Sequence, residues 1–170
     1  MEEFNWKQEG FSGRNYVVNA AAGHAGKLVF DGWSSYNAVY SLGENKLMFS
    51  SKGWFEQEVT IHYNGEVIGH GTTSTFGKTR IDMVSGERYV IQSKSFSQEQ
   101  AMTDGTGQRI VTFKQPGFSF GKGQIAVADG VSELTKVVLV GTGLYFKALT
   151  DSQTTILIAV FIPVFLQIMR

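Results

Sequence analysis

The hydrophobic and polar positions of residues 15–145 follow a short alternating pattern that glycine interrupts repeatedly. A period of two fits a strand with one buried and one exposed face. The pattern predicts about ten to twelve short strands at near-regular spacing, which is typical of an antiparallel barrel or sandwich. The predicted strands cover 16–20, 27–30, 36–42, 46–50, 56–63, 66–71, 79–84, 87–93, 108–114, 124–128 and 137–146.

The clearest local signal is the pair of segments around Asn64-Gly65. Apolar and polar residues alternate in 56–63, and a second strand pattern follows the dipeptide. Asn-Gly tolerates a positive φ at both positions, as a type I′ turn requires. The sequence therefore predicts a two-residue hairpin, in a register that places His62 opposite Val67.

The C-terminal segment differs in kind from this strand pattern. Ile156–Leu166 has no charged and no hydrogen-bonding side chain. Asp151 or Ser152 is suited to cap the N-terminus of a helix. Pro163 lies inside the apolar run, so we expect a kink or a local break there.

Two architectures accommodate this segment. A helix over 154–169 is about 24 Å long, which is short of the roughly 30 Å of hydrocarbon that a membrane span crosses. A fully apolar helix of that length fits inside a closed barrel, so our leading prediction is a single domain over 1–170. Its about twelve antiparallel strands surround a central helix at 151–169. The alternative is a tail-anchored membrane protein, with a β domain in water and a span at 155–169.

The order of features resembles the tubby C-terminal-domain-like superfamily, which includes tubby proteins, phospholipid scramblases and plant LURP-one-related proteins. Segments 46–50 and 53–55 resemble a strand and aromatic turn of its compact LURP-one/scramblase-like branch, 59–69 resembles a hairpin, and 151–169 resembles its central helix. The resemblance implies a twelve-stranded barrel around a hydrophobic helix, and lipid or membrane association in some members. The phosphoinositide site of tubby proteins and the acidic segment of scramblases have no counterpart here that we can align.

The composition limits which kinds of partner and site we expect. Fifteen basic and fifteen acidic residues cancel, so no overall field attracts nucleic acid or anionic lipid, and we expect no nucleic-acid partner. The absence of Cys excludes disulfides, thiolate catalysis and Cys-based zinc sites. The start of the chain, MEEFNWKQEG, has no basic and apolar signal-peptide pattern. We therefore expect a cytoplasmic protein, or one that faces the cytoplasm at a membrane.

One cluster of basic residues is a candidate ligand site. Positions i and i+2 of a strand share a face, and the neighbouring strand extends that face, so the cations could together hold a phosphate or a lipid head group. Asp82 and Glu87 are close enough in sequence to neutralise it as cross-strand pairs. The four candidate residues are Lys78, Arg80, Arg88 and Lys94.

Other motifs support no specific chemistry. Residues 71–79 are one residue too long for a phosphate-binding P-loop and precede a strand pattern, and 121–126 lacks the βαβ context of a dinucleotide site. His24, His62 and His70 have no pattern of convergent ligands, so we expect neither metal nor cofactor. Aromatics near turns favour capping of the barrel mouth, with contact to a membrane interface as the alternative. They are Trp33, Tyr36, Trp54, Phe55, Phe118 and Phe120.

No catalytic constellation is evident, so we expect a non-enzymatic binding or adaptor protein. Its expected partner is a membrane phospholipid head group or a membrane-linked protein. A small β-rich enzyme or carbohydrate binder is the remaining reading, and it would need a polar cleft with a perturbed titratable group.

Overall fold

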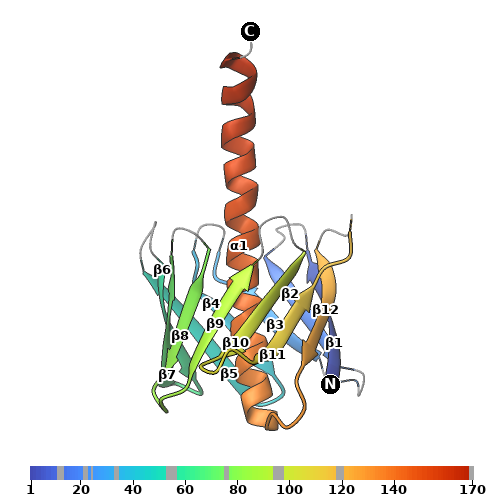
Figure 1. Ribbon diagram of the computed structural model, residues 1–170, viewed down its shortest axis with the longest axis vertical. Helices are drawn as coiled ribbons and strands as arrows, with labels where there is room; N and C mark the ends of the chain where they lie inside the picture. Colours follow the sequence, from blue (N-terminus) through green and yellow to red (C-terminus); the bar gives the residue numbers. More distant parts are fainter. Residues whose placement is uncertain are drawn as a thin grey trace.

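The computed structural model describes residues 1–10, 14–20, 23, 25–32, 35–52, 57–74, 77–93, 98–117 and 121–168, without the side chains of 57, 93 and 152–168. They form a closed barrel of twelve antiparallel strands with one helix along its axis (Figure 1). This confirms the predicted fold class. The strands are β1 (Glu2–Glu9), β2 (Asn15–Ala20), β3 (Ala25–Phe30), β4 (Ala38–Leu42), β5 (Asn45–Lys52), β6 (Gln57–Tyr63), β7 (Glu66–Thr73), β8 (Thr79–Met83), β9 (Arg88–Ser93), β10 (Glu99–Asp104), β11 (Arg109–Lys114) and β12 (Lys122–Val127), and the helix is α1 (Glu133–Ile168).

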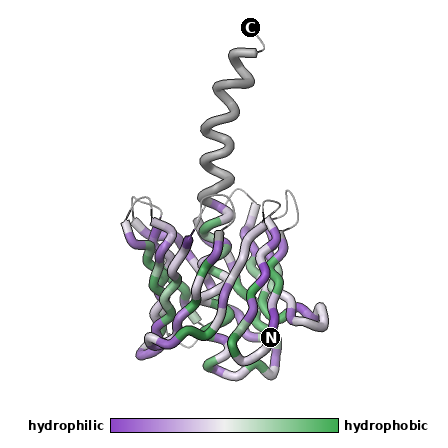
Figure 2. Tube along the Cα trace, turned by 90° about the vertical axis from the view of Figure 1, so that its left-hand side faces the viewer, coloured by the Kyte–Doolittle hydropathy of each residue, from purple (hydrophilic) through white to green (hydrophobic). Residues whose placement is uncertain are grey.

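Each strand pairs with its neighbours in the sequence, and the first strand closes the barrel against the last. The closing register runs from Glu2 opposite Val127 to Lys7 opposite Lys122. Closure leaves no strand edge exposed for pairing with another chain. Apolar and polar residues alternate along the strands (Figure 2), so one face of each strand points inward to the helix and the other outward to solvent.

The two ends of the barrel differ, and we name them by the course of α1. At the entrance end, Glu133 and Leu134 lie around the same cavity as the β4–β5 turn. At the exit end, the Tyr145 hydroxyl donates a hydrogen bond to the carbonyl of Tyr36, which precedes β4 (2.8 Å). Because all strands are antiparallel, odd-numbered strands run toward the exit end and even-numbered strands run back from it.

The helix begins with a side-chain cap. The Oγ of Ser132 accepts a hydrogen bond from the backbone N–H of Thr135 (3.2 Å), which satisfies one of the free first-turn amides. Gly130 just before it has a φ of 81°, a left-handed conformation that glycine adopts without strain. These two residues turn the chain from β12 into the barrel axis.

Glycines allow close contact between α1 and the wall. A Cβ on Gly143 would lie 2.5 Å from ring atoms of Phe113, and one on Gly71 in β7 would lie 2.5 Å from Phe146. Side chains from Val137 to Leu149 are largely buried against the inward faces of the strands. The interior of the barrel is therefore filled by α1 and by the inward-facing side chains of the strands, whereas a small barrel without a helix is filled by side chains alone.

Three sequence predictions about the end of the chain are wrong, and two strands elsewhere were not predicted. The apolar run 137–146 is not a final strand but lies inside α1, and the helix within the barrel is built by Val137–Leu149 rather than 151–169. The helix continues through Pro163 without the expected break. The sequence pattern did not predict two of the twelve strands, β1 and β10.

The predicted hairpin is confirmed in detail. Asn64 and Gly65 have φ values of 48° and 94°, as a type I′ turn requires. His62 pairs with Val67, and the register shifts by one residue between Ile61 and His62.

Candidate functional site at the exit end of the barrel

A buried lysine marks the point where α1 leaves the barrel. The side chain of Lys147 is 9% exposed, and its Nζ lies 3.0 Å from Oδ2 of Asp151, one turn later. It also donates to Oε1 of Gln115 (3.3 Å) and lies 5.1 Å above the ring of Trp6. A buried ammonium group needs such partners to offset its lost hydration, so this network fixes the helix to β1 and to the residue that follows β11.

Stacked aromatic rings fill the barrel beside this network. The ring of Tyr145 lies between Phe49 (centroids 4.3 Å apart) and Phe30 (5.7 Å). Burial raises the pKa of the Tyr145 hydroxyl well above its usual value, so this group remains a hydrogen-bond donor. The guanidinium of Arg14 lies 5.0 Å above the outer ring, Phe30, and donates to the carbonyl of Ser35. Stacked rings therefore fill the barrel beside α1 at this end, and a cation lies over the outermost of them.

Charge divides between the two halves of the barrel. In the exit half, basic residues outnumber acidic ones among those described: Lys7, Arg14, Lys52, Lys78, Arg80, Lys114, Lys122 and Lys147 against Glu9, Asp31, Glu58, Glu99 and Asp151. In the entrance half the order is reversed: Lys27, Lys46, Arg88, Arg109 and Lys136 against Glu2, Glu3, Glu44, Glu66, Asp82, Glu87, Asp104, Asp129 and Glu133. A chain with no net charge thus carries a dipole along the barrel axis.

The predicted basic cluster is only partly assembled. Lys78 and Arg80 are exposed at the exit end of β8. Arg88 lies at the other end of the next strand, where its Nε is 3.1 Å from Oδ1 of Asp82. The anticipated neutralisation therefore occurs at Arg88, away from the other two cations. Lys94 lies outside the described residues.

The remaining candidates are distributed as follows. His62 and His70 lie on adjacent strands with different cross-strand partners, and His24 is outside the described residues. Over the described part of the chain, no three metal-binding side chains converge. Of the aromatics near turns, Tyr36 is described and partly buried, whereas Trp33, Trp54, Phe55, Phe118 and Phe120 are not described.

The sequence analysis did not predict the residues that form the contacts at the exit end. Lys147 interrupts an otherwise apolar stretch and precedes Asp151 by four positions, which is the spacing of an ion pair on one helix face. That signal was available but was obscured because 137–146 resembled a strand. The contacts of Arg14 and Trp6 with residues distant in sequence had no local signal.

Comparison with known proteins gives no relative. No family, no curated protein and no solved structure matches this chain significantly. The resemblance to the tubby-like superfamily therefore stays a prediction. A search of the described residues for a helix long and apolar enough to cross a bilayer found none.

Proposed function

We propose that the protein is a non-enzymatic, membrane-attached binding domain. In this proposal the C-terminal half of α1 inserts into the lipid, and the exit end of the barrel faces the head groups. The observation that carries it is the length of α1 relative to the barrel. Its 36 residues correspond to about 54 Å, whereas the longest strands have eight residues, or about 26 Å.

The helix continues where the barrel no longer covers it. Figure 1 shows α1 extending past the strands at the exit end. The sequence beyond Asp151 has no charge until Arg170, and Ile156–Leu166 is wholly apolar. Exposure of such a segment to water is unfavourable by roughly 25 cal/mol per Å² of apolar surface. A lipid layer removes that cost, and it suits a helix because the backbone bonds are satisfied internally.

The charge distribution supports the same orientation. A basic exit half would lie against anionic head groups, where each Lys or Arg contributes about 1 kcal/mol. The acidic entrance half would point away from the membrane. Lys78 and Arg80 are the predicted ligand residues that this arrangement retains, as contacts to phosphate groups.

Membrane attachment is tested with two variants that carry the same added charge. Ile158→Lys/Phe161→Lys introduces two cations into the apolar segment, each unfavourable by about 2.5–3.5 kcal/mol at the centre of a bilayer. Val67→Lys/Val84→Lys places two on exposed apolar residues of the entrance half, which are 43% and 69% exposed. Membranes from cells that express the full chain are washed with alkaline carbonate, and the retained fraction is measured.

We expect the wild type and the entrance-half variant to stay in the membrane and the tail variant to be released. Release of the wild type by carbonate, or retention of the tail variant, would contradict insertion. A chain that ends at Gln153 keeps every turn of α1 inside the barrel, so it should be soluble and melt cooperatively. An unfolded truncation would show that the segment belongs to the barrel core.

Head-group contact is tested with the same truncated chain and lipid vesicles. We expect binding to vesicles that contain anionic phospholipid and none to neutral vesicles. Lys78→Glu/Arg80→Glu should weaken that binding, while Lys27→Glu/Lys46→Glu in the entrance half should not. Equal effects of the two variants would mean that the exit face does not contact the head groups.

A further inference from the structure

A cavity remains at the entrance end, on the side opposite the proposed membrane contact. Its volume is about 670 Å³, which is within the range of small-molecule sites. It lies between the first turns of α1 and the entrance ends of β1–β6. Its lining is mostly apolar and includes Phe4, Val18, Tyr40, Leu42, Leu134 and Val137.

Small residues on the wall and an uneven helix face create this space. Ala20 and Gly43 line the cavity with small side chains, and a Cβ on Gly43 would meet no heavy atom within 4 Å. On α1, Leu134 lines the cavity and is 51% exposed. The helix thus fills the barrel tightly at the exit end and incompletely at the entrance end.

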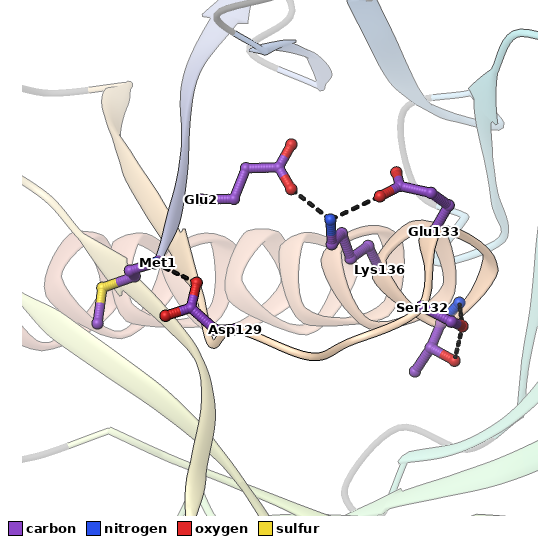
Figure 3. A network of polar contacts seen from close by, with 7 residues as sticks. Met1, Glu2, Asp129, Ser132, Glu133 and Lys136 are labelled. Carbon is purple, nitrogen blue, oxygen red and sulfur yellow. Dashed lines mark hydrogen bonds and ion pairs between the residues drawn. The ribbon is translucent and has the colours of Figure 1, made fainter.

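The rim of the cavity carries carboxylates around a single ammonium group. Nζ of Lys136 lies 2.5 Å from Oε2 of Glu2 and 2.7 Å from Oε1 of Glu133 (Figure 3). Hydrogen bonds to these carboxylates raise the pKa of Lys136, so it remains charged and is already paired. Glu2 and Glu133 keep 43% and 87% of their side chains exposed. The rim therefore has a net negative charge, within the acidic half of the barrel.

The wall also includes a buried phenol. Tyr40 lines the cavity and is 1% exposed. Its hydroxyl points at Gly26, because a Cβ there would lie 2.4 Å from that oxygen. The phenol therefore supplies a polar atom to a wall that is otherwise mostly apolar.

We propose that this cavity binds a small apolar amine, with its apolar body between α1 and the wall and its cation at Glu2 and Glu133. An anionic amphiphile fits the same apolar walls but meets two exposed carboxylates and an ammonium group that is already paired. Charge at the rim thus selects among molecules that the walls do not distinguish. The site is independent of the proposed membrane attachment, since it lies at the opposite end of the barrel.

The test uses three probes that differ in one group: 3-phenylpropylamine, 3-phenylpropanol and 3-phenylpropanoate. The full chain is held in lipid nanodiscs with methyl-labelled leucine and valine, and shifts of the methyl signals are followed by NMR. The cavity supplies its own reporters in Val18, Leu42, Leu134, Val137 and Val140. We expect saturable shifts at these methyls, with the amine binding about tenfold more tightly than the carboxylate and the alcohol between them.

Reversing the charge of the two rim carboxylates tests directly whether they determine the preference for an amine. Glu2→Lys/Glu133→Lys should reverse the order and favour the carboxylate, whereas Glu66→Lys, at the same end but outside the lining, should preserve it. The methyl spectrum without probe shows whether each variant is folded. Absence of saturable shifts at the cavity methyls with every probe, or a carboxylate that binds the wild type as tightly as the amine, would overturn the proposal.

Discussion

The contact between Gly143 of α1 and Phe113 of β11 sets two physical effects against each other. Gly→Ala in a helix interior is normally stabilising by about 1 kcal/mol. Here the added Cβ would lie 2.5 Å from two ring atoms of Phe113 and 3.3 Å from Cε of Met102. Phe113 is 1% exposed, so the ring has no free space to move into, and overpacking costs about 1–3 kcal/mol. We expect Gly143→Ala to lower the free energy of unfolding by about 1 kcal/mol.

The assay is thermal melting of the full chain in a mild detergent, followed by circular dichroism. For a chain of this size, 1 kcal/mol corresponds to a fall of about 2–4 °C in Tm. Phe113→Leu alone should also destabilise, because it removes buried ring atoms. The double variant should lose less than the two single losses together, since the smaller side chain admits the new methyl group.

A matched glycine gives the control. Gly105 has no heavy atom within 4 Å of a built Cβ, so Gly105→Ala should change Tm little. If Gly143→Ala raised Tm by the amount that helix propensity alone predicts, the close packing of α1 against β11 would be refuted. Additive effects of Gly143→Ala and Phe113→Leu would refute their contact.

Three further predictions concern polar contacts. Tyr145→Phe keeps the ring stack but leaves the Tyr36 carbonyl without its donor, so urea unfolding should show a loss of about 1 kcal/mol. Asp151→Asn should destabilise by about 1–3 kcal/mol, because the buried Lys147 ammonium loses its counter-ion, whereas Lys147→Met should change the same unfolding free energy by less. Hydrogen bonds from Thr106 hold the pKa of Asp104 below its usual value; their stabilisation is therefore present above the unfolded-state pKa of about 3.9 and lost as pH falls through the folded-state pKa, and Asp104→Asn should remove that part of the pH dependence. An Asp104 carboxyl that titrates at its ordinary pKa by NMR would contradict this.

The barrel was predictable because its strands carry their own signals. Alternation and turn residues such as Asn64-Gly65 are local, and a type I′ turn fixes the register of its hairpin without help from distant residues. The sequence contains no comparable local signal for the position of the central helix. Residues 137–146 are rich in valine and glycine, and a helix buried on every side shows no amphipathic period.

The candidate site was less predictable than the fold. Lys78, which directly precedes β8, and Arg80 within β8 are both exposed, in agreement with their spacing along the sequence. It could not place Arg88, because the cross-strand register pairs that residue with Asp82. The contacts at the exit end involve residues such as Trp6 and Lys147, which are brought together only when the barrel closes around α1.

The order of elements also constrains how the barrel can form. Every strand pairs with a neighbour in the sequence except at one place, the seam, where β1 pairs with β12 at the other end of the sheet. Neighbour pairings close short loops quickly, whereas the seam closes a loop of more than a hundred residues. The side chains of Val137–Leu149 are largely buried against the strands, so we expect the closure of the seam to enclose α1. A substitution at the β1–β12 seam should therefore slow folding more than one in a hairpin.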